Sequence, residues 1–200
     1  MTRAIFSCIG GEIHLPDKDL VLVDRQDGGN LIVNPPREVW ERSELSPREL
    51  IHWSYLVAAT GRGMIDVLPQ LRGGCVNYWE AGNWALNIDA VPKGPKVTPM
   101  IRRVHLHLFG RSRFASNDSW KWGEAPKFPD FNDRFRWSSG FRQLDPEECC
   151  SIVTAVERSL TSEYGMTSEQ IAAWSACAFC KFPFPTVKGG GECFHCGKRM

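Results

Sequence analysis

The chain has 200 residues, of which 42% are hydrophobic, enough for one ordinary core and a small appended unit. Its 24 basic residues nearly balance its 23 acidic ones, so the net charge of +1 does not indicate a nucleic acid, a membrane or a strongly acidic partner. Residues 1–15 hold no long apolar run, and no stretch approaches the roughly 20 apolar residues that cross a bilayer. We therefore expect a cytoplasmic protein without a membrane partner.

The eight cysteines fall into two groups. Four form two Cys-x-x-Cys pairs near the C-terminus, and this pattern is typical of a metal site in a reducing compartment. The other four are scattered in apolar surroundings and are predicted to be buried thiols. They are Cys8, Cys75, Cys149 and Cys150.

The first elements in chain order are predicted strands. Residues 4–6 and 20–23 are apolar runs, and Gly-Gly and Pro-Asp pairs between them favour tight turns. We expect these runs to pair as antiparallel strands.

A long amphipathic helix follows. Ser46 is its predicted cap, Pro47 occupies the first turn, and Glu49 completes a capping box. Apolar residues recur at helical spacing over residues 50–68. The two glycines in residues 61–63 mark a place where the helix could break.

Strand character returns at residues 75–79 and 84–88, followed by a loop at residues 91–96, because proline and glycine there do not suit a central strand. Residues 102–109 then alternate as a strand with two different faces. One face carries Arg103, His105 and His107, and the other carries Val104, Leu106 and Leu108.

Residues 111–142 are predicted to be irregular, with eight aromatic side chains interleaved with basic ones. Such a segment could stack on and neutralise a single-stranded nucleic acid. More often it wraps the core and packs its rings there, which is the interpretation that we favour.

Two further helices are predicted after this segment. Asp145 opens an amphipathic helix that runs to Leu160, and residues 167–170 begin a short helix that ends near Trp174. The predicted organisation is therefore a main domain at 1–143, a helical connector at 144–174 and a cysteine-containing module at 175–200.

The zinc ribbon prediction rests on the spacing of Cys177, Cys180, Cys193 and Cys196. Two Cys-x-x-Cys turns supply the four thiolates that a tetrahedral site needs, and the Pro- and Gly-containing spacer at residues 181–192 suits a β-hairpin. The alternative is a pair of redox motifs, but no thioredoxin-like strand and helix surround either pair. A closed four-cysteine site has no open position, so Zn²⁺ is expected to be structural.

His105 and His107 lie two apart on one strand face, and three interpretations are open. A metal site would need further ligands, for which His14, His52 and scattered carboxylates are the candidates. A solvent-facing edge would need none. In the third interpretation one imidazole attacks phosphorus, and the other stabilises the charge that develops in the reaction.

Residues 103–111 (Arg-Val-His-Leu-His-Leu-Phe-Gly-Arg) resemble the strand of the histidine-triad (HIT) superfamily, with its His-x-His-x-His pattern. Residues 77–83 (Asn-Tyr-Trp-Glu-Ala-Gly-Asn) are similar to the segment that precedes this strand in many bacterial members. Residues 23–35 resemble the ribose-side strands, and residues 44–50 the helix start. The resemblance covers about residues 3–143.

The resemblance implies an α+β fold with a five-stranded antiparallel sheet and a long helix, commonly dimeric and binding a nucleotide. It implies that His105 attacks the α-phosphorus to form a nucleotidyl-histidine, and that His107 contacts phosphate oxygens and helps the leaving group. Asp24 would bind the ribose hydroxyls. Asn77 and Asn83 would hold the phosphates and order the histidine strand.

The sequence departs from the family pattern at three places. Arg103 stands where the first histidine is expected, and its guanidinium could bind phosphate and stabilise developing charge. Residues 84–102 form an insertion that suits a lid or specificity loop. Gly110 replaces the usual proline.

Two functional hypotheses follow. The first is a hydrolase or nucleotidyl transferase that acts on a nucleoside phosphate ester, anhydride or amidate, with His105 as nucleophile and Arg103 and His107 as further catalytic groups. The second is a non-catalytic module that senses a nucleotide or a nucleic-acid end, while the zinc ribbon docks a partner. A nucleotidyl adduct on His105 would distinguish them.

Overall fold

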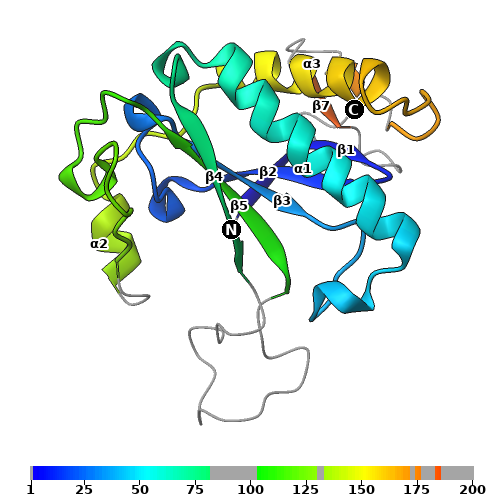
Figure 1. Cartoon of the computed structure of the whole chain (residues 1–200), viewed down its shortest axis with the longest axis horizontal. Coiled ribbons are helices and arrows are strands. Elements are labelled where there is room, and N and C mark those ends of the chain that lie inside the picture. Colours follow the sequence, from blue (N-terminus) through cyan, green and yellow to red (C-terminus); the bar gives the residue numbers. More distant parts are fainter. Residues whose placement is uncertain (1, 82–102, 130–132, 172–173, 177–182, 186–200) are drawn as a thin grey trace, which may run out of the picture.

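A five-stranded antiparallel sheet and one long helix organise the chain (Figure 1). The computed structural model describes residues 2–81, 103–129, 133–171, 174–176 and 183–185. The sheet order is β1-β2-β3-β5-β4, and each neighbouring pair is antiparallel, so the expected α+β architecture is confirmed. The strands are β1 Thr2–Cys8, β2 Gly11–Pro16, β3 Asn30–Asn34, β4 Cys75–Ala81 and β5 His105–Arg111.

The long helix is α1, Pro47–Val67, and it begins with the predicted capping box. The Glu49 amide donates to the Ser46 hydroxyl at 3.3 Å, while the Ser46 amide donates to the Glu49 carboxylate at 2.7 Å. The helix does not break at its glycines. A Cβ on Gly61 would lie 2.0 Å from the Tyr78 hydroxyl, so glycine there permits close packing of α1 on β4.

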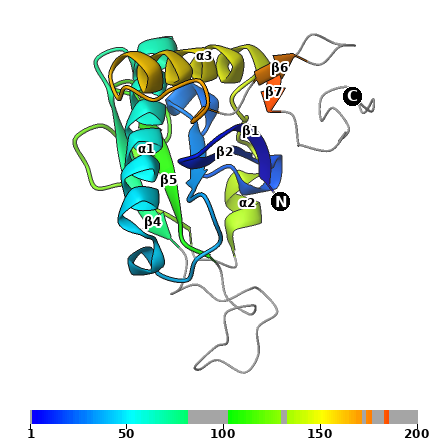
Figure 2. The same cartoon turned by 90° about the vertical axis from the view of Figure 1, so that its right-hand side faces the viewer.

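A second long helix, α3 (Pro146–Ser162), extends the same core. Figure 2 shows α3 crossing α1 near the C-terminal end of α1, where Gly63 lies against Ile152. The segment predicted as a helical connector therefore packs against the sheet domain. The shared core includes Leu31, Val33, Leu56, Met64, Leu108, Ile152, Val156 and Leu160.

The predicted strand at residues 20–23 is wrong, because the chain there is a 3₁₀ turn, Lys18–Leu20, and a loop. Side chains from elsewhere satisfy its backbone. The Leu22 amide donates to the Asn30 carboxamide at 3.1 Å, and the Leu22 carbonyl accepts from the Trp137 indole at 3.1 Å. Trp137 belongs to the short helix α2, Arg134–Ser138.

The predicted short helix after Thr167 is also wrong. Residues 168–170 form a turn, and Ile171 makes an isolated bridge to Cys8. Two short strands, β6 Trp174–Ala176 and β7 Pro183–Pro185, then pair as an antiparallel hairpin.

Several predictions fall outside the described residues. They concern Asn83, the strand at residues 84–88, the loop at residues 91–96 and the insertion, together with Cys177, Cys180, Cys193 and Cys196. Cys177 and Cys180 fall, in sequence, between β6 and β7.

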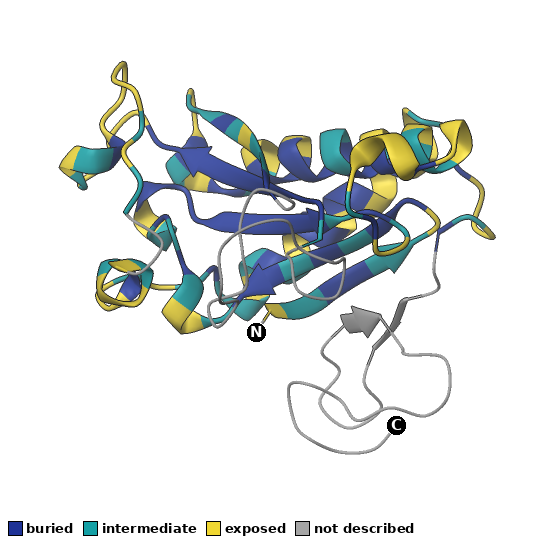
Figure 3. Ribbon diagram, turned by 90° about the horizontal axis from the view of Figure 1, so that it is seen from below, coloured by how far each residue is buried: buried dark blue, intermediate teal, exposed yellow. Residues whose placement is uncertain are grey.

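Burial follows the layers of the fold. Figure 3 shows buried residues concentrated in the strands and exposed residues on the outer turns and helix surfaces. Within the part of the chain that the structure describes, none of the helices combines the length and apolar character needed to cross a membrane.

Candidate functional site

The strand register places both histidines on the face of the sheet that points away from α1. Directly paired residues of antiparallel strands point to the same side, and His107 lies opposite Trp79 on β4 and Ile32 on β3. His105 lies opposite Ala81, the last residue of β4. The other face of these strands is buried in the core through Leu31, Val33, Leu106 and Leu108.

Aromatic rings close one half of this face. The His107 ring stacks on Phe109 with centroids 5.3 Å apart and an interplanar angle of 11°. Trp120 and Phe128 pack over Phe109, and the Trp120 indole donates to the Gly110 carbonyl at 2.8 Å. Trp120 and Phe128, two rings of the segment 111–142, thus pack on the sheet. Phe114 is 86% exposed and does not.

Arg111 on β5 joins the segment after β5 to the sheet through hydrogen bonds. Its guanidinium is buried, donates to the carbonyls of Lys121 and Glu124, and lies 5.2 Å from the Trp120 ring. It also donates to the Asn77 carboxamide at 3.4 Å. Arg111 therefore ties together β4, β5 and the wrapping segment.

The hydrogen bonds of His105 assign its tautomer. Its Nδ1 lies 2.7 Å from the carbonyl oxygen of Arg103, and a carbonyl can only accept, so Nδ1 carries the proton. The neutral ring then has its lone pair on Nε2. Since Nε2 of His105 is 3.1 Å from Nε2 of His107, His107 donates from Nε2 in the neutral pair. The pair is buried, at 8% and 7% exposure.

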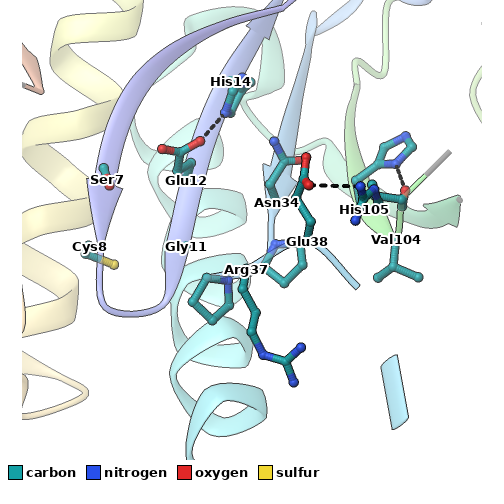
Figure 4. A pocket seen from close by; sticks show the side chains of 13 residues that line it. Ser7, Cys8, Gly11, Glu12, His14, Asn34, Arg37, Glu38, Val104 and His105 are labelled. Atoms are coloured by element: carbon teal, nitrogen blue, oxygen red, sulfur yellow. Dashed lines mark hydrogen bonds and ion pairs between the residues drawn. The ribbon is translucent and has the colours of Figure 1, made fainter. Parts of the chain in front are cut away.

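The other half of the face is open as a pocket of about 610 Å³. Figure 4 shows that β2 and the chain after β3 form one side of the pocket, with His105 opposite them. This volume lies in the range that accommodates a small-molecule ligand. Its titratable lining residues other than Cys8 are Glu12, His14, Arg37, Glu38, Arg103 and His105.

The charged groups of this pocket are paired with one another or with neighbours. The Arg103 guanidinium lies 3.0 Å from the Glu38 carboxylate, and the Arg37 guanidinium donates to Glu49 at 2.9 Å. His14 lies 2.8 Å from the Glu12 carboxylate. This hydrogen bond lowers the pKa of Glu12, which favours its charged form.

Asp24 lies at the other end of the histidine strand. Its carboxylate accepts from the amides of Gln26 and Arg142, each at 2.8 Å, and so caps a 3₁₀ turn. Its carbonyl binds the Gly29 amide, and the Gly29 carbonyl binds the Gly110 amide, five positions from His105. The structure therefore does not bring Asp24 together with His105.

Of the predicted site residues, the structure brings together Arg103, His105 and His107. Asn77 faces the same side of the sheet but lies opposite Phe109, toward the Arg111 end. Sequence reasoning missed Glu38. Its signal in the sequence was its position after Pro35-Pro36, which follow β3 and start a loop beside β5.

Among the described residues, no group of three or more His, Cys, Asp or Glu side chains is arranged to hold a metal ion. No model of a known protein family matches the sequence, and neither does any curated protein. The resemblance to the HIT superfamily therefore rests on the motifs quoted above.

Proposed function

We propose that the protein is a HIT-like hydrolase or nucleotidyl transferase that acts at the α-phosphorus of a nucleoside phosphate ester, anhydride or amidate. The observation that carries the proposal is the hydrogen bond from Nδ1 of His105 to the Arg103 carbonyl. It leaves the lone pair of His105 on Nε2, which is the atom that can attack phosphorus. An open pocket adjoins the same side chain.

In the first step, Nε2 of His105 attacks the α-phosphorus. The new N–P bond forms as the bond to the leaving group breaks. His107 enters this step as an imidazolium, protonated on both ring nitrogens, gives its Nε2 proton to the leaving group and becomes a neutral ring. The nucleotidyl-imidazole carries a positive charge. The Arg103 carbonyl stabilises this charge, because it accepts the hydrogen bond from Nδ1.

In the second step, water attacks the same phosphorus. His107, now with a lone pair on Nε2, takes the proton of the water, and the N–P electron pair returns to His105. Both histidines regain their starting protonation states, so the cycle closes without another acid or base. Another nucleophile in place of water would give a nucleotidyl transfer.

Arg103 is suited to the phosphoryl group in both steps. It lies on the same face as His105, two positions away, and lines the same pocket. Its guanidinium could donate to the non-bridging oxygens that gain charge as the imidazole attacks. The ion pair with Glu38 is also compatible with the second hypothesis, a nucleotide sensor without turnover.

The decisive experiment is to trap the adduct. The full-length protein is incubated separately with adenosine phosphoramidate, a nucleotide sugar, a dinucleoside polyphosphate and adenylated DNA. It is then denatured at alkaline pH, because the N–P bond is labile in acid, and analysed by peptide mass spectrometry. We expect a nucleotidyl group on His105 with at least one substrate.

His105→Asn is the matched variant, because its carboxamide N–H can replace the Nδ1–H donor while Nε2 is lost. It should fold, bind nucleotide and form no adduct. His52→Asn on α1 controls for loss of a histidine outside the pocket and should behave as wild type. Nucleotide binding by the wild type without adduct or turnover would support the sensor instead.

A further inference from the structure

Glu38 and Arg103 join two segments beside the nucleophile. The Val104 amide donates to the Val39 carbonyl at 3.0 Å, and next to this bond the Glu38 carboxylate lies 3.0 Å from the Arg103 guanidinium. Backbone and side chains therefore hold the two segments together at the same point. Arg103 lies two residues before His105, and its carbonyl holds Nδ1 of that ring.

The ion pair is exposed enough to exchange partners. The Glu38 side chain is 74% exposed and that of Arg103 is 36% exposed. Exposed ion pairs contribute about 0–1 kcal/mol, so an entering phosphoryl group can replace Glu38 at little cost. The backbone hydrogen bond between Val104 and Val39 does not involve either side chain, and it remains when the partners exchange.

Among the residues described, both arginines that line the pocket already form ion pairs with carboxylates. Arg37 is paired with Glu49, and Arg103 with Glu38. Glu12, held by His14, adds a second carboxylate to the lining. One phosphoryl group can take the place of Glu38 on Arg103, but each further phosphoryl group would meet carboxylates.

We propose that Glu38 is a specificity-determining residue. It gives up its ion pair with Arg103 to a single phosphoryl group, and its charge disfavours substrates with a polyphosphate chain. This inference rests on the proposed function and narrows it. The preferred substrates are then nucleoside monophosphate esters or amidates, whose leaving group is an alcohol or an amine. Glu38 itself need not touch the reacting atoms.

The test measures binding of AMP, ADP and ATP to the wild type and to Glu38→Gln by calorimetry, in metal-free buffer at low ionic strength. The wild type should bind AMP most tightly. We expect Glu38→Gln to strengthen ATP binding by about tenfold and AMP binding by about threefold, because the extra phosphates lose a repulsive charge. This readout does not depend on turnover.

Two controls separate this role from other effects. Glu157→Gln changes the net charge equally on the exposed side of α3 and should leave all three affinities unchanged. In an Arg103→Ala background, Glu38→Gln should no longer strengthen AMP binding, because the gain for AMP comes from releasing Arg103 from its ion pair with Glu38. Thermal unfolding of each variant checks that a changed affinity does not reflect a damaged fold.

The outcomes are distinguishable. Equal gains for AMP and ATP, or no gain, in a Glu38→Gln variant that unfolds as the wild type does would overturn the inference while the proposed function stands. Weaker binding of every nucleotide would show a structural role for Glu38 and also overturn it. If the wild type binds no nucleotide, the proposed function fails and this inference fails with it.

Discussion

Nε2 of His105 and Nε2 of His107 lie 3.1 Å apart, so the two imidazoles are hydrogen-bonded to each other. Phe109 holds His107 from behind, with a nearly parallel ring 5.3 Å away. Under the proposed function, a phosphoryl group that bonds to Nε2 of His105 would break this hydrogen bond. The Nε2 donor of His107 would then turn to an oxygen of the substrate.

The first prediction concerns His107. His107→Gln keeps an N–H donor near the position of Nε2 but cannot accept and release a proton at neutral pH. We expect turnover to fall by about a hundredfold or more, as for loss of a general acid, while the His105 adduct still forms with an activated substrate whose leaving group needs no proton. Steady-state rates measured with activated and unactivated leaving groups test this, and an equal loss for both would contradict it.

The second prediction concerns Arg103. Arg103→Ala removes the guanidinium but keeps the backbone carbonyl that orients His105. The loss should therefore fall on turnover, by about a hundredfold, as for removal of a comparable transition-state donor, with a smaller change in substrate affinity. Arg103→His should retain part of the activity. Unchanged turnover of Arg103→Ala in rapid-quench kinetics would exclude this role.

The third prediction concerns alkaline pH. Burial raises the pKa of the Cys149 thiol to about 12 and that of Cys8 to about 11. From about pH 9 the unfolded chain releases these protons while the folded protein keeps them, so the free energy of unfolding must fall as pH rises. Each thiol can contribute a slope of roughly 1.4 kcal/mol per pH unit in this window.

Urea unfolding of the wild type between pH 8 and about 11 measures this slope. Cys149→Ala should make it shallower, whereas Val153→Ala, which shortens another buried side chain of α3, should lower stability without changing the slope. A stability that stays constant from pH 8 to about 11 would be incompatible with buried neutral thiols.

The fourth prediction concerns Cys177, Cys180, Cys193 and Cys196, which lie outside the described residues. We expect one tightly bound zinc ion per chain, lost together with C-terminal structure on chelation. Cys177→Ser should abolish zinc binding and make the segment after residue 174 sensitive to protease, with the sheet domain intact. Cys150→Ser, at a free cysteine on α3, should keep the metal. Elemental analysis that finds no zinc in wild-type protein purified under reducing conditions would refute the prediction.

The elements that could be predicted from sequence are those with local causes. The start of α1 was predictable because Ser46 and Glu49 satisfy each other's backbone amides within one turn. The histidine strand was predictable because its apolar and polar residues alternate. The pairing of Arg103, His105 and His107 on one face follows from that alternation alone.

The failures have long-range causes. Residues 20–23 resemble a strand, but the Asn30 and Trp137 side chains take the hydrogen bonds that a neighbouring strand would need. The motif around Asp24 predicts that its carboxylate binds ribose hydroxyls. In the structure this carboxylate accepts hydrogen bonds from the amides of Gln26 and Arg142. Trp137 and Arg142 lie 115 and 118 residues from their partners, so no short window of sequence contains both ends of these contacts.

Gly110 illustrates the same limit. A Cβ at this position would lie 2.1 Å from the carbonyl oxygen of Gly28, which itself has a positive φ of 125°. Two glycines far apart in sequence thus allow two backbones to touch. The sequence shows only that the usual proline is missing, and the reason becomes visible once β3 and β5 are paired.

The ends of the 82–102 segment have a consequence for engineering. The chain leaves the sheet at Ala81 and is described again from Arg103, and Ala81 is the direct neighbour of His105 across the sheet. The remaining β4–β5 ladder continues from there to Cys75 and Arg111, and the aromatic rings and the core hold it on both faces. Residues 82–102 therefore connect two positions that the sheet fixes, Ala81 and Arg103, and a library of replacements for this segment could be screened without rebuilding the strand that carries His105.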